Sequence, residues 1–163
     1  MTPIIIDIEA SGFGAMCYPI EVGVALADGQ RHSMLIHPVA EWTDWESSAE
    51  SLHQISRETL LAHGKPVREV ADLLNSLLAG QSAYSDGWVV DRPWLTSLFH
   101  AARVPMQFTL SPIEQLMSEA QIECWDTVKL QLIDEAAATR HRASFDAWII
   151  QQTFVRSREL AES

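Results

Sequence analysis

The chain has 163 residues, 47% of them hydrophobic, and a formal net charge of −11. This length predicts one domain over residues 1–163, and no apolar run is long enough to span a membrane. The acidic excess argues against a basic track for long nucleic acid, and without a signal-peptide pattern we expect a cytoplasmic protein with no membrane partner.

The first predicted element is a buried strand over residues 3–9, because this run is apolar and β-branched. Side chains two apart on a strand share a face, so Asp7 and Glu9 lie together at its carboxyl end. Two such carboxylates repel each other and are costly to desolvate, which Mg²⁺ or Mn²⁺ would relieve. The alternative is an acidic pair that faces water, and the pair alone does not decide between the two.

Two further strands are predicted over residues 18–27 and 31–38, with Asp28–Gly29 as a two-residue hairpin turn between them. The polar, acidic residues 40–51 are expected to form a solvated surface segment. Leucines and a valine within 70–78 recur at the spacing of an amphipathic helix.

The second half of the chain alternates between strand and helix patterns. Strands are predicted over 82–85 and 106–110, and helices around Trp94–Phe99 and over 112–119, 126–138 and 143–158. Three early strands followed by this alternation predict an α/β or α+β layered fold.

Four further residues are candidates for chemistry. Asp91 opens a helix directly after a strand, where an acid is ordinarily a cap, and Asp86 competes with it for any other role. His141 lies just before the last predicted helix and Asp146 lies in its first turn, so both side chains can reach one cleft. The histidines and the two cysteines show no zinc-ligand spacing, and both thiols are expected to be reduced.

These residues, in this order, resemble the DEDDh family of 3′→5′ exonucleases, which includes oligoribonuclease, RNase T and polymerase proofreading subunits. The segments AYSDGWVVDRPWL (83–95) and HRASFDA (141–147) match the family's mid-chain Asp and its His-x-x-x-x-Asp. YPIEVGVAL (18–26) resembles the second strand, and LHQIS (52–56) resembles the His-Gly-Ile segment, with Gln54 in place of the Gly. The resemblance implies an α/β, RNase H-like fold: a mixed five-stranded sheet flanked by helices.

The resemblance also implies the site. Asp7, Glu9, Asp91 and Asp146 would hold two Mg²⁺ or Mn²⁺ ions, and His141 would be the general base. Asp91 fits the family's spacing to Trp94–Leu95 better than Asp86 does, although the choice between them stays open. The substrate-binding residues would be Ser11, Gly12, Phe13, His53, Asp86 and Arg142.

Each of these roles has a simpler alternative. Phe13 either stacks on the terminal base or packs in the core, and Arg140 and Arg142 either meet phosphate or are solvated. Trp42, Trp45 and Trp88 are predicted to be loop tryptophans without an assigned purpose.

The implied function is a metal-dependent exonuclease, a single domain over residues 1–163 that releases nucleoside 5′-monophosphates from the 3′ ends of single-stranded or short DNA or RNA. The acidic charge favours a site for only a few nucleotides. One alternative is a catalytically weak nucleic-acid or nucleotide-binding module; another is a phosphodiesterase acting on dinucleotides. The choice between DNA and RNA stays open, as does the oligomeric state, for which the resemblance suggests a homodimer.

Overall fold

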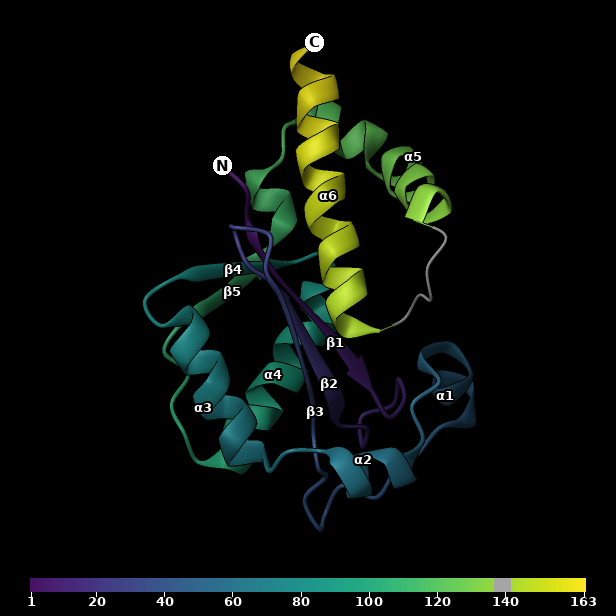
Figure 1. Cartoon of the computed structure of the whole chain (residues 1–163), viewed down its shortest axis with the longest axis vertical. Coiled ribbons are helices and arrows are strands. Elements are labelled where there is room, and N and C mark those ends of the chain that lie inside the picture. The colour runs from purple at the N-terminus through teal and green to yellow at the C-terminus, as the bar shows by residue number, and fades with distance from the viewer. Residues whose placement is uncertain (137–141) are drawn as a thin grey trace.

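The computed structural model describes residues 1–136 and 142–163, which form a mixed five-stranded sheet flanked by helices (Figure 1). The strands are β1 (Ile4–Ala10), β2 (Pro19–Ala25), β3 (Arg31–Leu35), β4 (Ser82–Ser85) and β5 (Thr109–Pro112). The helices are α1 (Ser47–His53), α2 (Arg57–His63), α3 (Val67–Leu78), α4 (Trp88–Ala102), the 3₁₀ turn η1 (Ile113–Leu116), α5 (Glu119–Ala136) and α6 (Ala143–Glu162). The predicted α/β architecture is confirmed.

The strand order is β3-β2-β1-β4-β5, so β1 lies at the centre of the sheet. It pairs antiparallel with β2 and parallel with β4; β2 pairs antiparallel with β3, and β4 pairs parallel with β5. The parallel pairs are made through α3 and α4, as parallel strands require crossover connections.

Side-chain alternation along β1 sorts its residues between two layers. Ile4, Ile6 and Ile8 pack in the larger core with α3 and α4, whereas Ile5 packs with α6 on the opposite face. Asp7 and Glu9 share the Ile5 face and therefore point toward α6. Figure 1 shows α6 lying along β1 and β2, with α5 beside it.

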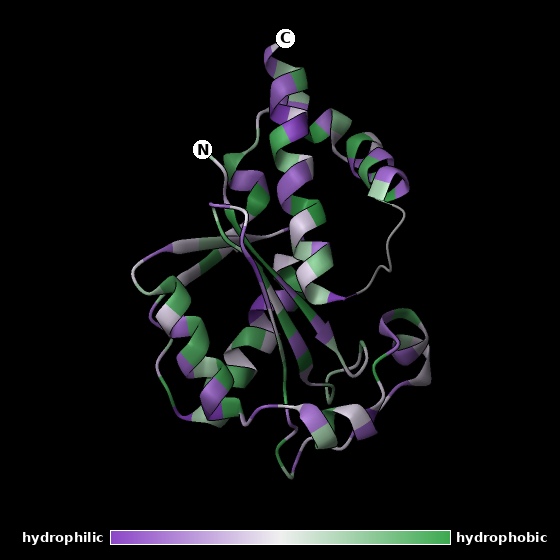
Figure 2. Ribbon diagram, in the orientation of Figure 1, coloured by the Kyte–Doolittle hydropathy of each residue, from purple (hydrophilic) through white to green (hydrophobic). Residues whose placement is uncertain are grey.

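Apolar residues follow these layers. Along α6 they point both to the sheet and to α5, so green segments alternate with purple ones around this helix in Figure 2. None of the helices within residues 1–136 and 142–163 is long and apolar enough to cross a membrane.

The turn between β2 and β3 is one residue longer than predicted. Leu26 and Gln30 pair through the backbone, which leaves Ala27, Asp28 and Gly29 as a three-residue loop. Gly29 has φ +88°, the left-handed conformation that such a loop places at its last residue. Asp28 Oδ1 accepts a hydrogen bond from the Gln30 N–H at 2.9 Å, so the aspartate stabilises the turn.

Other boundaries also differ from the predicted ones. The segment predicted as a solvated excursion contains the start of α1 at Ser47, and β5 begins at Thr109 rather than at residue 106. The helix predicted over 112–119 is only a 3₁₀ turn, and α5 begins at Glu119, before the predicted 126. The two cysteines are free thiols, as expected.

Gln54 ends α1 in the left-handed conformation, with φ 58° and ψ 30°. Its N–H donates to the carbonyl of Glu50, a common way to end a helix, and Gly is the residue best suited to this position. The one departure noted in the His-Gly-Ile segment therefore keeps the backbone shape that the Gly would favour.

Candidate active site

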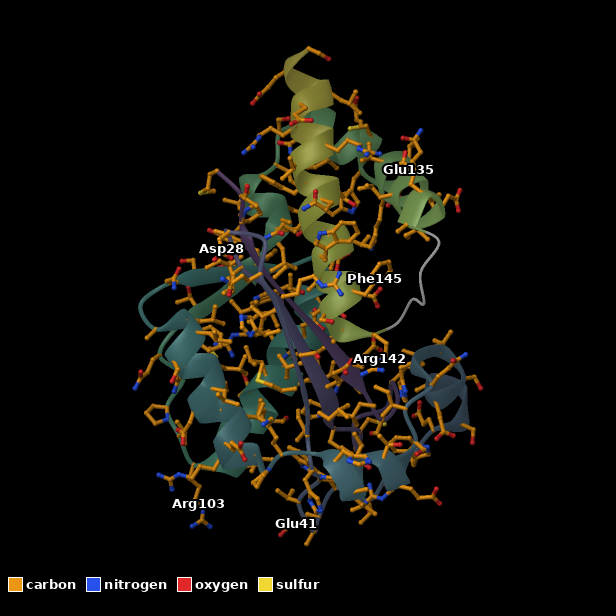
Figure 3. The ribbon with its side chains drawn as sticks, in the orientation of Figure 1. Asp28, Glu41, Arg103, Glu135, Arg142 and Phe145 are labelled. Carbon is orange, nitrogen blue, oxygen red and sulfur yellow. The ribbon has the colours of Figure 1, made fainter. Side chains whose placement is uncertain are left out.

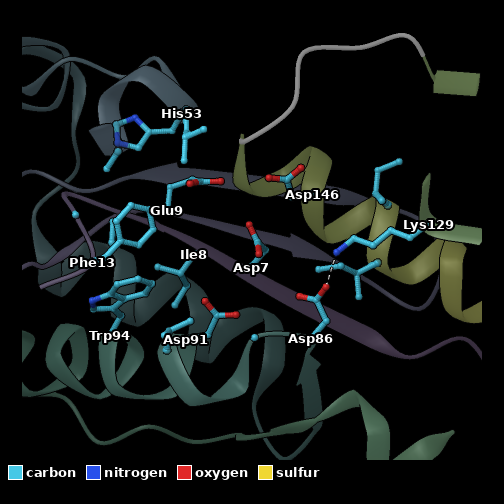
Figure 4. Close-up of a pocket in the computed structure, with 18 residues that line it drawn as sticks. Asp7, Ile8, Glu9, Phe13, His53, Asp86, Asp91, Trp94, Lys129 and Asp146 are labelled. Atoms are coloured by element: carbon cyan, nitrogen blue, oxygen red, sulfur yellow. Dashed lines mark hydrogen bonds and ion pairs between the residues drawn. The ribbon is translucent and has the colours of Figure 1, made fainter. Parts of the chain in front are cut away.

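Three acidic side chains meet between the end of β1 and the start of α6. Asp7, Glu9 and Asp146 each offer a carboxylate oxygen, and these three atoms lie within 4.8 Å of one another. Figure 4 shows the three side chains converging from the strand and the helix across a cavity. Carboxylate oxygens at this spacing suit a hard divalent cation.

Gly23 brings α6 close enough to supply Asp146. Gly23 is the register partner of Asp7 on β2, and a Cβ built there would lie 2.0 Å from the Ala143 carbonyl carbon. The backbone of Ala143 therefore rests directly on the sheet beside Asp7, which only a glycine at this position allows.

Glu21 fixes the first turn of the same helix. This carboxylate is 1% exposed and accepts from the Ala143 N–H at 2.8 Å and from Arg142 Nη2 at 2.7 Å. Glu21 is the register partner of Glu9, so the strand pair carries both an acid of the cluster and the anchor of the helix that completes it. Figure 3 shows Arg142 at the beginning of α6.

The carboxyl groups of the cluster are both buried and close to one another, which disfavours their ionised forms. Burial raises the pKa of Asp7 well above its ordinary value, and the negative charges of Asp91 and Glu9 raise it further. Burial also raises the pKa of Glu9 to about 9, helped by the charge of Asp146 and a hydrogen bond with it. A divalent cation would offset the repulsion and favour the ionised carboxylates despite their burial, so the residues fit such an ion.

Asp91 lies beside this cluster without being part of it. It is 3% exposed, and its carboxylate accepts a hydrogen bond from the Ser85 hydroxyl. Burial raises the pKa of Asp91 to about 7, against the lowering effect of the Ser85 hydrogen bond. Among the acidic neighbours of Asp7, Asp91 raises its pKa most and Asp86 least.

Asp86 has a different partner. Its carboxylate accepts from the ammonium of Lys129, on α5, with 2.7 Å between Nζ and Oδ2. Lys129 was not among the predicted site residues, because nothing along the chain connects it to Asp86.

The cavity that these residues line has a volume of about 310 Å³. Figure 4 shows Phe13, Trp94 and His53 at one end, Lys129 and Asp86 at the other, and the acids between them. Phe13 is 70% exposed, so it does not pack in the core. An exposed ring at the edge of a polar cavity is suited to stacking on a base.

Glu46 holds the loop that carries Phe13. Its carboxylate accepts from the backbone N–H groups of Phe13, at 2.8 Å, and Gly14, at 3.3 Å, and the first of these holds the pKa of Glu46 below its ordinary value. A Cβ at Gly12 would lie 2.3 Å from the Glu46 carboxyl carbon. With Glu46 in this position, only a residue without a side chain fits between this loop and Glu46, and Gly12 lines the cavity there.

His53 lines the same end of the cavity. Its Nδ1 accepts from the Ile55 N–H at 3.0 Å, which leaves the proton on Nε2, and burial lowers the pKa of the imidazole. The buried Nε2 makes no hydrogen bond of good geometry among the described residues, and a backbone contact with Ala10 raises the pKa of the imidazole against the effect of burial. Trp45 contacts the His53 ring edge-on, with 5.9 Å between ring centroids.

The other predicted site residues lie elsewhere. Ser11 is buried and its hydroxyl accepts from the Tyr18 N–H, and Arg142 pairs with Glu21; neither lines the cavity. His141 and Arg140 fall outside the described residues. Trp42 stacks on Tyr18, whereas Trp88 begins α4 rather than lying in a loop, and its Nε1 donates to the Leu110 carbonyl.

Solved structures of exonuclease I share this fold. One structure of the enzyme aligns with a TM-score of 0.71 and 11% identity over 98% of this chain. Escherichia coli exonuclease I in complex with a dA16 oligonucleotide gives 0.67 and 13% over 98%, and exonuclease I from Methylocaldum szegediense gives 0.65 and 11% over 96%. The predicted RNase H-like fold is confirmed.

This chain corresponds to only part of those proteins, covering 42%, 42% and 40% of the three exonuclease I chains. No family model matches the sequence, and no curated protein does. At these identities the likeness establishes the fold alone.

Proposed function

We propose that this chain is a divalent-metal-dependent 3′→5′ exonuclease of the DEDDh type, working as a single domain over residues 1–163. One observation carries the proposal: Asp7, Glu9 and Asp146 converge within 4.8 Å, on a fold shared with exonuclease I. A binding module has no physical need for buried carboxylates that repel one another. The cluster instead suits an enzyme that uses cations to act on phosphate.

Asp7, Glu9 and Asp146 would hold one Mg²⁺ or Mn²⁺ ion, and Asp7 together with Asp91 would hold a second. Such ions supply a nucleophile at neutral pH and stabilise charge on the phosphoryl oxygens. The protein contributes the spacing, since β1 fixes Asp7 and Glu9, and Glu21 with Gly23 fixes the helix that carries Asp146.

The substrate would enter with its 3′-terminal base at the Phe13 end of the cavity. Phe13 would stack on that base, and the Nε2–H of His53 would donate to an oxygen of the terminal nucleotide. The phosphate would then lie over the acidic cluster. The cavity volume of about 310 Å³ is consistent with a site that holds one nucleotide at a time.

His141 is the proposed general base, by its place in the HRASFDA segment. Loss of the base in His141→Ala should lower the single-turnover rate by about 10²–10⁴-fold. Mn²⁺ affinity and the melting temperature should not change, because the carboxylates remain. An unaltered rate in the folded, Mn²⁺-bound variant would remove this assignment.

The test of the proposal is cleavage of 5′-labelled single-stranded DNA and RNA and of dinucleotides with Mg²⁺ or Mn²⁺. We expect stepwise shortening from the 3′ end, release of 5′-monophosphates, and complete inhibition by a chelator. Asp7→Asn should abolish turnover and keep the fold, and Asp72→Asn, an exposed aspartate, is the matched control. Turnover that resists chelation, or cleavage of a closed circular strand, would contradict the proposal; cleavage of dinucleotides alone would support the phosphodiesterase alternative.

A further inference from the structure

Lys129 is the sole lysine or arginine among the described residues that line the cavity. Five carboxylates line the same cavity, from Asp7, Glu9, Asp86, Asp91 and Asp146. A phosphate that enters this space meets a strongly negative wall. Positive charge from the protein itself is therefore available from one side chain only, within the part of the chain that the structure describes.

The packing of α5 on α6 places this ammonium. Val128, next to Lys129, is buried against Ile149 and Phe145 of α6, in a cluster that Leu132 completes. The same helix thus seats one residue in the core and turns its neighbour toward the cavity. Figure 4 shows the Lys129 ammonium directed into the space beside Asp7, at the end opposite Phe13.

Asp86 holds the ammonium there, through the contact of 2.7 Å between Nζ and Oδ2. The two side chains keep 29% and 20% of their exposure, so solvent reaches the pair and limits what it adds to stability. One carboxylate does not use all three donors of an ammonium, so Lys129 keeps donors for a second acceptor.

We propose that Lys129 is a substrate-contacting residue, whose ammonium donates to a non-bridging oxygen of the phosphate that lies over Asp7. This inference rests on the proposed function for the identity of the substrate, a nucleotide phosphate. Asp86 is then a positioning residue that aims the ammonium. Phe13 and Lys129 hold the two ends of one nucleotide unit, its base and its phosphate.

The deciding experiment compares binding of thymidine 5′-monophosphate and of thymidine to the full chain with Mn²⁺ by calorimetry. Lys129→Met should weaken monophosphate binding by about 10–150-fold, the range for a hydrogen bond to a charged group, and leave thymidine binding unchanged. Lys129→Arg should restore part of the loss. Lys65→Met, which breaks an exposed ion pair with Glu69, is the matched control and should leave both affinities unchanged.

A Mn²⁺ titration separates this role from a structural one. Removal of a cation from beside the acids should leave Mn²⁺ affinity equal or higher in Lys129→Met, while monophosphate binding and turnover fall. Asp86→Asn should show a smaller loss of monophosphate affinity. Equal loss of thymidine and monophosphate binding with a lower melting temperature, or wild-type monophosphate affinity in Lys129→Met, would overturn the proposal.

Failure of the exonuclease proposal gives a different result. The wild-type chain could cleave no nucleic acid and still bind the monophosphate through Lys129. That result would contradict the exonuclease proposal and support the Lys129 contact. A wild-type chain that does not bind the monophosphate would remove the Lys129 contact itself.

Discussion

At the scale of single residues, Glu9 of the acidic cluster and Asp91 beside it have raised pKa values when no cation neutralises them. The pKa is about 9 for Glu9 and about 7 for Asp91, both above the values of an unfolded chain. Between the ordinary carboxyl pKa of about 4 and its raised folded value, each group keeps a proton in the folded state that it loses in the unfolded chain. The stability that these two groups contribute without metal is therefore fully present at low pH and is lost as the pH rises through about 7 for Asp91 and about 9 for Glu9.

The first prediction follows from this sign. In a chelator, the melting temperature should fall as the pH is raised from about 6 to about 9, and Mn²⁺ affinity should rise over the same window, because the ion needs deprotonated carboxylates. Differential scanning fluorimetry and Mn²⁺ titration measure the two. Glu9→Gln should flatten the upper part of the stability curve. A melting temperature that rises with pH in the chelator would contradict the prediction.

The second prediction concerns the effect of Phe13→Ala on the affinity for an oligonucleotide. Loss of a stacking ring should weaken binding of a single-stranded oligonucleotide by about 1–3 kcal/mol. The melting temperature should not change, because the Phe13 side chain is 70% exposed. Fluorescence anisotropy on an Asp7→Asn background measures the affinity without cleavage. Met16→Ala, equally exposed at 71%, is the control; a similar loss from both variants would argue against stacking.

The pairing of Asp7 with Glu9 was predictable from a local pattern, whereas their meeting with Asp146, from the other end of the chain, was implied only by the family resemblance. Two-residue periodicity places Asp7 and Glu9 on one face, and the first turn of a helix limits where Asp146 points. Lys129 and the Ser85 hydroxyl were not predictable, since their contacts depend on how α5 and the β4–α4 junction pack. Arg142 was predicted to meet substrate, yet it pairs with Glu21, and this pair joins residues 121 positions apart.

At the scale of elements, the site depends on how closely α6 approaches β2. Gly23→Ala places a methyl group against the Ala143 backbone, so α6 must shift. This third prediction is a loss of about 1–3 kcal/mol of unfolding free energy, as for overpacked cores, together with weaker Mn²⁺ binding as Asp146 moves. Urea denaturation and Mn²⁺ titration measure both.

Gly29→Ala is the control, because its φ of +88° strains an alanine while a Cβ there meets no atom within 4 Å, so stability should fall and Mn²⁺ affinity should not. A Gly23→Ala protein with the stability and metal affinity of the wild type would show that the close approach of α6 does not position Asp146.

The elements themselves were largely predictable, and their ends were not. Apolar periodicity identified the strands and the long helices, since burial imposes it. The pattern gave no start for α1, because only Ala49 and His53 are buried in it. It also missed the first turns of α5, since only Gln121, Val128 and Leu132 of its residues are buried, too few to mark one continuous face.

At the scale of the whole molecule, the net charge of −11 would limit how nucleic acid binds on the proposed function. The fourth prediction is a shallow dependence of oligonucleotide affinity on salt, with a slope of about −0.7 per phosphate contact and only a few contacts. Titrations of the Asp7→Asn protein in different NaCl concentrations measure the slope. A steep slope with tight binding to long duplex would contradict it.

The order of the acidic residues along the chain determines when the site becomes complete during synthesis and folding. Asp7 and Glu9 come from the first strand, Asp91 follows the fourth, and Asp146 comes from the last helix described. An emerging polypeptide thus holds its first two acids long before the third and fourth exist. On the proposed function, the ion would have no complete set of ligands until α6 packs against β1 and β2, so a half-folded or unfinished chain would be inert toward the nucleic acid around it.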